Sequence, residues 1–149
     1  YGLIAFCSNS VAQILRLYRD QGRLLTMTDK KVVFVAFAIE DVRIRDMIKG
    51  QSLNTDSPFE YIDISVKEAY DEEWKRKVRT RILRSNGVLV IVSKNSLESS
   101  GQKWEVQCAK EENKKSRGIW AYKEDRTNLV GVNTMVWNWP NIAAWIDSL

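Results

Sequence analysis

One carboxylate, Glu105, lies where the pattern of its helix favours an apolar residue. The segment Gly87 to Glu112 reads as an apolar strand, a polar loop and a helix. At about 100° per residue, Glu105 points into the apolar arc that includes Cys108 and Ala109. A solvated carboxylate is unexpected there, so Glu105 is the candidate catalytic residue. The alternative is an ordinary surface carboxylate, because Glu112 points the same way.

The other chemistry open to the chain is limited by its composition. Its 149 residues include no histidine, which excludes the commonest general base, the commonest zinc ligand and every Ser-His or Cys-His dyad. Neither a GxxxxGK[ST] phosphate loop nor a GxGxxG motif is present. A phosphoacceptor receiver domain would end its third strand in aspartate, where this chain has Ser93, Lys94 and Asn95. Chemistry must therefore use carboxylates, hydroxyls or backbone amides.

Strand and helix patterns alternate along the chain. The four predicted strands are residues 31–38, 59–65, 88–92 and 118–122. The predicted helices are 41–50, 70–86, a helix capped at Ser99 that contains Glu105, and a last helix that begins near Pro140. This order predicts a flavodoxin-like α/β fold, a parallel sheet with helices on both faces.

Details of these helices follow from their residue types. Met47 is expected on the apolar face of the first helix, and Gly50 is expected to end it. Trp74 is interpreted as core of the second helix, with a base-stacking role as the alternative. Ser99 and Gln102 have the spacing of a capping box.

The substrate-binding candidates follow the predicted strands, because ligands of parallel sheets bind at the carboxyl ends of the strands. Phe37 and Ala38 end the first strand, Asp63 and Ser65 the second, and Ser93 follows the third. A core role is the alternative for Phe37. Turn capping is the alternative for Asp63 and Ser65.

Length and charge predict the organisation and setting of the protein. Residues 27–149 suffice for one domain. The net charge of +4 is spread along the chain, which argues against nucleic acid as a partner. Cys7 and Cys108 fit no disulfide framework, so we expect a reducing cytoplasm. No apolar stretch is long enough to cross a membrane, and the opening GLIAF run lacks a basic leader.

Residues 1–26 are predicted to form a separate helical extension. Ser10 and Gln13 have capping-box spacing, and an apolar stripe follows them to Gly22. This helix is expected either to dock on the domain or to serve as an assembly or partner-binding arm.

Several segments together resemble the TIR-like family typified by the Thoeris anti-phage proteins, a flavodoxin-like branch of the TIR superfamily. They are KKVVFVAFAIED, FEYIDIS, VLVIVSKNS, KWEVQCA and VWNWPNIAAWI, and they span roughly residues 30–149. The Asn-Thr type turn of the family corresponds to Asn95-Ser96, and its Trp-Glu-Ile segment to Trp104-Glu105-Val106. Ala109 takes the small position four residues after the glutamate.

The resemblance implies that Glu105 is the catalytic glutamate of an NAD-cleaving enzyme, with Trp104 among the residues that bind the substrate. NAD would be the substrate, and no separate cofactor or metal is implied. The product would be ADP-ribose or a cyclic ADP-ribose-type nucleotide, which signals to a separate effector protein in bacterial antiviral defence. Self-assembly is also common in this family.

Two positions differ from the family pattern. Members often have serine where this chain has Ala36, and a further tryptophan where it has Gly101. These differences leave a second interpretation open, a TIR-like interaction or assembly module without catalysis.

Overall fold

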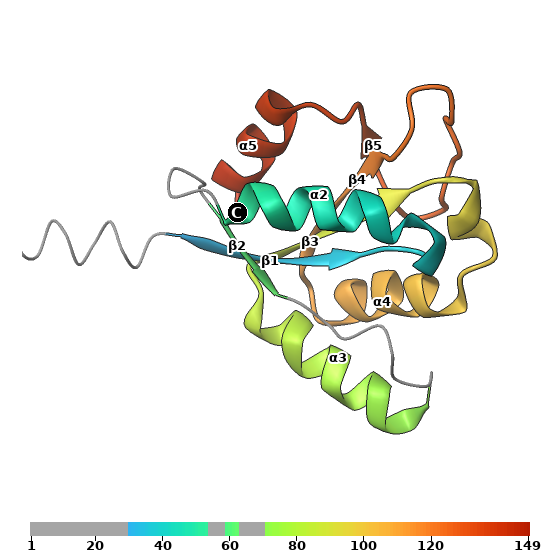
Figure 1. The fold of residues 1–149 in the computed structure, drawn as a ribbon. Coiled ribbons are helices and arrows are strands. Elements are labelled where there is room, and N and C mark those ends of the chain that lie inside the picture. The colour runs from blue at the N-terminus through green and yellow to red at the C-terminus, as the bar shows by residue number, and fades with distance from the viewer. Residues whose placement is uncertain (1–29, 54–58, 63–70) are drawn as a thin grey trace, which may run out of the picture. The chain divides into compact units, whose positions relative to one another are not determined.

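A computed structural model describes residues 30–53, 59–62 and 71–149 of the chain. Residues 31–149 form one compact unit (Figure 1). Its sheet contains β1 (Lys31–Ala36), β2 (Phe59–Ile62), β3 (Gly87–Val92), β4 (Lys115–Trp120) and β5 (Thr134–Met135). The strands lie in the order β2-β1-β3-β4-β5, and every pair is parallel. The predicted α/β fold with a parallel sheet is confirmed, whereas the predicted helix within residues 1–26 lies outside the described residues.

Helices cover both faces of the sheet (Figure 1). On one face lie α2 (Val42–Ser52) and α5 (Trp139–Asp147), and on the other lie α3 (Glu72–Arg84) and α4 (Ser100–Glu111). Two short 3-10 helices, η1 (Ile39–Asp41) and η2 (Lys94–Leu97), follow β1 and β3. Because α2 and α4 leave adjacent strands for opposite faces, the carboxyl ends of β1 and β3 flank a topological switch point.

The central strands are apolar because both of their faces are covered. All six residues of β3 are buried. In β1, Phe34 and Ala36 pack into the core on the side of α3 and α4, whereas Val33 and Val35 pack into the core on the side of α2 and α5. Side chains of a strand alternate between faces, so one continuous β-branched run supplies two cores.

Local capping fixes where the helices begin. The Asp71 side chain accepts a hydrogen bond from the Trp74 backbone at 2.8 Å, which caps α3. The Asn138 side chain caps α5 in the same way by accepting a hydrogen bond from the Asn141 backbone. Pro140 lies in the first turn of α5, as predicted. The interpretation of Trp74 as core is confirmed, since it is buried.

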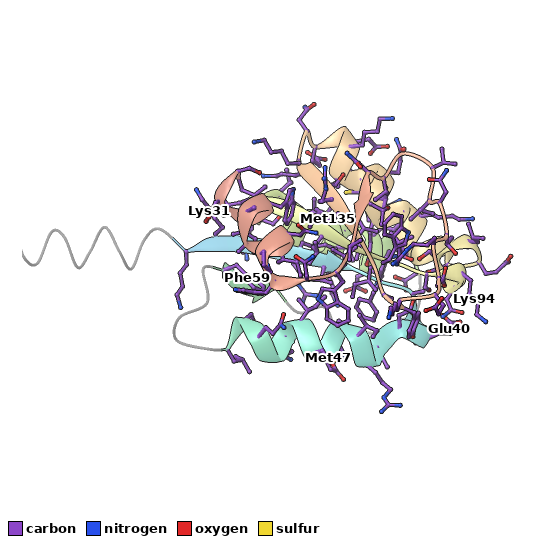
Figure 2. The ribbon with its side chains drawn as sticks, turned by 90° about the horizontal axis from the view of Figure 1, so that it is seen from above. Lys31, Glu40, Met47, Phe59, Lys94 and Met135 are labelled. Carbon is purple, nitrogen blue, oxygen red and sulfur yellow. The ribbon has the colours of Figure 1, made fainter. Side chains whose placement is uncertain are left out.

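Several predicted details are wrong. Gly50 does not end the first helix, because α2 continues to Ser52. Met47 is 56 % exposed and lies on the side of α2 away from the sheet (Figure 2). Strand β1 ends at Ala36 rather than at residue 38, and β4 runs from Lys115 to Trp120. The two-residue strand β5 carries too short a pattern to be recognised from sequence.

Candidate active site

Glu105 is buried in the structure, as its place in the apolar arc predicted. It lies on α4, which packs against β1, β3 and β4, and only 7 % of it is exposed. Its Oε2 atom has no hydrogen-bond partner among the described residues. Burial raises the pKa of the carboxyl group well above the ordinary value of 4.5, because the protein interior disfavours its charged form.

Glu112 differs from Glu105 although both point in similar directions along α4. It forms an ion pair with Arg79 of α3, and Arg79 also pairs with Glu111 at 2.9 Å. These contacts hold two helices together near the surface. The neighbouring carboxylates of α4 are thus accounted for by ion pairs, whereas the pKa of Glu105 is raised by burial.

Gln102 lies one turn before Glu105 and is also buried. The Ser99 side chain caps α4 by accepting from the Gln102 backbone at 3.3 Å, as predicted. The predicted reciprocal half of the capping box is wrong, because the side chain of Gln102 turns to the sheet. Its Nε2 atom donates to the carbonyl oxygens of Ala36 at 3.2 Å and Ile91 at 2.6 Å. Gln102 therefore connects the carboxyl ends of β1 and β3.

The buried carboxylate of Asp41 is the centre of a hydrogen-bond network at the same edge of the sheet. Its Oδ2 atom accepts from the Ser93 hydroxyl at 2.5 Å. Its Oδ1 atom accepts from Asn95 Nδ2 and from the Tyr122 hydroxyl, both at 3.0 Å. The carboxylate thus joins the ends of β1, β3 and β4.

Sequence reasoning did not identify Asp41 as a site residue. It placed Asp41 at the end of the first strand and took it as the residue that opens the following helix, yet the side chain makes no capping hydrogen bond to α2. The available signal was the position of an acidic residue just after the first apolar strand, which is where site residues of parallel sheets gather.

Ser93 lies at the carboxyl end of β3, as predicted, and is fully buried. Its hydroxyl accepts from the Asn95 backbone at 3.1 Å in addition to donating to Asp41. Its own backbone amide donates to the hydroxyl of Ser96 at 3.1 Å. Ser93 and Ser96 therefore form the capping box of η2.

The other described candidates lie around the end of β1 and on α4. Phe37 is half-buried, with the guanidinium of Arg45 5.0 Å from its ring centroid. Ala38 is buried, and its carbonyl oxygen accepts from the Asp41 backbone at 2.8 Å. Trp104 is half-buried and packs edge-on against Trp74, with ring centroids 5.6 Å apart. Substrate binding by Phe37, Ala38, Ser93 and Trp104 stays a prediction, and Asp63 and Ser65 lie outside the described residues.

An open pocket of about 730 Å³ lies next to the network of Asp41. Its lining residues are Lys94, Tyr122, Glu124, Asp125, Arg126 and Thr127. Asp125 fixes this loop by accepting from the Lys94 backbone at 2.7 Å and from the Thr127 hydroxyl at 2.5 Å. The hydrogen bond from the Thr127 side chain has the largest effect on the pKa of Asp125, which it lowers. The backbone bond from Lys94 lowers it further. Figure 2 shows Lys94 and Glu40 at one end of the molecule, where β1 and β3 end.

The chain matches no protein-family model and no curated protein sequence. Among the described residues, no group of three or more Asp, Glu or Cys side chains is arranged to hold a metal ion. The helices of the described part also lack the length and hydropathy that crossing a bilayer requires.

Proposed function

We propose that this protein is a TIR-like enzyme that cleaves the bond between nicotinamide and ribose in NAD, with Glu105 as the catalytic carboxylate. The observation that carries the proposal is the buried carboxyl group of Glu105, whose Oε2 atom has no partner within the described ranges. Buried groups without partners are rare in folded proteins and call for an explanation. A catalytic role supplies one, and the sequence resemblance around Trp104 and Glu105 indicates which reaction.

The chemistry suits a chain without histidine. As the bond between C1′ of the ribose and the pyridinium nitrogen breaks, its electron pair goes to the nitrogen and neutral nicotinamide leaves, so no general acid is needed. The ribose becomes an oxocarbenium-like cation, which a carboxylate stabilises. Water then adds at C1′ and releases a proton to give ADP-ribose, or another atom of the nucleotide adds to give a cyclic product.

Burial makes Glu105 responsive to a cationic substrate. Its raised pKa favours the neutral acid in the protein alone. A positive charge nearby lowers the pKa of a carboxyl group, so the substrate would favour the ionised form that the reaction requires. The interaction is also stronger in a site of low dielectric than in water.

The test is nicotinamide release from NAD, followed by mass spectrometry of the nucleotide products over a range of protein concentrations. Glu105→Gln is expected to keep the fold and to lower release by about 100-fold or more, the usual effect of losing one group that stabilises transition-state charge. Glu112→Gln is the matched control, because it lies on the same helix in an ion pair with Arg79, and it should retain most of the activity. Release by Glu105→Gln at the wild-type rate would refute the catalytic assignment.

A TIR-like interaction module without catalysis is the second candidate function. The observation that favours it is the 7 % exposure of Glu105, because a substrate must displace neighbouring groups to reach this carboxyl. If the wild type releases no nicotinamide at any protein concentration, this second function is favoured. Concentration-dependent assembly, measured by light scattering, would then support it.

A further inference from the structure

The amide group of Gln102 has a fixed orientation at the carboxyl ends of β1 and β3. The carbonyl oxygens of Ala36 and Ile91 can only accept hydrogen bonds, and Ile91 also accepts one from the Ser96 hydroxyl, so the nitrogen of the amide must face them. Its oxygen, Oε1, therefore faces away from these carbonyls. Oε1 is buried and accepts no hydrogen bond in the part of the chain that the structure describes.

Gln102 and Glu105 form a pair of buried acceptors that lack donors. Residues three apart in a helix are neighbours on one face, with Cβ atoms about 5–6 Å apart. Both residues lie on the buried side of α4, and each has one oxygen without a partner among the described residues. A ligand that offers two hydroxyl groups close together would satisfy both oxygens at once.

We infer that Gln102 is a substrate-binding residue whose amide oxygen accepts a hydrogen bond from a hydroxyl group of the nicotinamide ribose, beside the carboxylate of Glu105. The inference rests on the proposed cleavage of NAD. The two backbone contacts hold the amide in place before the substrate arrives, so little conformational freedom remains to be lost on binding. The ribose is a natural match, because its two adjacent hydroxyls are donors for two adjacent acceptors.

The structure also offers a purely structural role for Gln102, since its Nε2 atom connects two strands. The two roles predict different results with modified substrates. A connection between strands affects stability and does not distinguish NAD from an analogue that lacks one ribose hydroxyl. A contact with that hydroxyl does distinguish them.

The experiment compares kcat/KM for NAD with kcat/KM for analogues that lack the 2′- or the 3′-hydroxyl of the nicotinamide ribose. For the wild-type protein, kcat/KM is expected to be roughly 10-fold or more lower with at least one analogue than with NAD, as is typical when a buried hydrogen bond is left unmade. Gln102→Met keeps the length of the side chain but has no amide, and it should discriminate several-fold less against that analogue. The two changes are then coupled, as expected for groups in direct contact.

Gln107→Met is the matched control, because Gln107 lies on the exposed side of the same helix and its side chain donates to Glu111 at 3.3 Å. It should discriminate as the wild type does. Undiminished discrimination by a folded Gln102→Met variant, checked by circular dichroism, would overturn the inference while leaving NAD cleavage intact. Should that variant not fold, equal wild-type kcat/KM for NAD and both analogues overturns the inference. A wild type that cleaves no NAD contradicts the proposed function instead.

Discussion

Replacing Glu105 by glutamine should make the protein relatively more stable as the pH rises. Burial raises the pKa of Glu105 in the folded state above the ordinary value of 4.5 that applies to the unfolded chain. Between these two pKa values the folded protein binds a proton that the unfolded chain does not. The stability associated with this proton is fully present below about pH 4.5 and is lost as the pH rises through the folded-state pKa. Glutamine carries no such proton, so the variant does not undergo this loss.

The size of the effect follows from a single proton. One proton bound by only the folded state changes the free energy of unfolding by at most about 1.4 kcal/mol per pH unit. The difference between Glu105→Gln and wild type should therefore grow with a slope up to that limit above pH 4.5 and become constant above the folded-state pKa. For a chain of 149 residues, each 1 kcal/mol corresponds to about 2–4 °C in Tm.

Urea unfolding at several pH values between 4 and 8 measures this difference directly. The m-value should be the same for both proteins, which shows that the extent of unfolding has not changed. Glu111→Gln is a control of opposite sign, because hydrogen bonds from Arg79 and Gln107 lower the pKa of the exposed Glu111. Any contribution from Glu111 is present above its unfolded-state pKa and is lost as the pH falls.

A flat difference between Glu105→Gln and wild type over this pH range would refute the reasoning. It would mean that Glu105 is solvated or paired in the folded protein, contrary to its burial on α4. The same result would remove the physical basis for a substrate-responsive carboxyl group.

Two further stability predictions use matched pairs of substitutions and can be measured by thermal or urea unfolding. Asp41→Ala should lower the free energy of unfolding by about 1–3 kcal/mol, because the buried hydroxyl of Ser93 and two part-buried donors, Asn95 and Tyr122, lose their acceptor. Its control Asp46→Ala, which removes a largely exposed carboxylate paired with a neighbouring arginine, should cost under about 1 kcal/mol, and equal effects would contradict the network. Gly118→Ala should lower the free energy of unfolding by about 1–3 kcal/mol, because the added Cβ would lie 2.6 Å from Thr134 Oγ1. Gly50→Ala, within α2, adds a Cβ that meets no atom within 4 Å and should raise the free energy of unfolding by about 0.5–1 kcal/mol. Destabilisation by this substitution would show that α2 ends before Gly50.

The predictions that came true rest on patterns within single segments. The β-branched run from Lys31 identified a strand covered on both faces, and the direction of Glu105 identified a buried carboxyl group. The cap Ser99 and the first-turn residue Pro140 act within three positions in the chain, so they are also visible in the sequence. The errors at Gly50 and Met47 arose because packing and exposure depend on neighbours that a single helix pattern does not contain.

The sequence alone determined the alternation of strands and helices apart from β5, the absence of histidine and the unusual position of Glu105. Only the tertiary structure determined that Asp41 meets Tyr122, 81 residues away, and that Gln102 reaches Ala36, 66 residues away. The physical reason is the register of the parallel strands. Residues distant in the chain come together where strands end side by side, and the hydrogen bonds made there depend on distances that no local pattern contains.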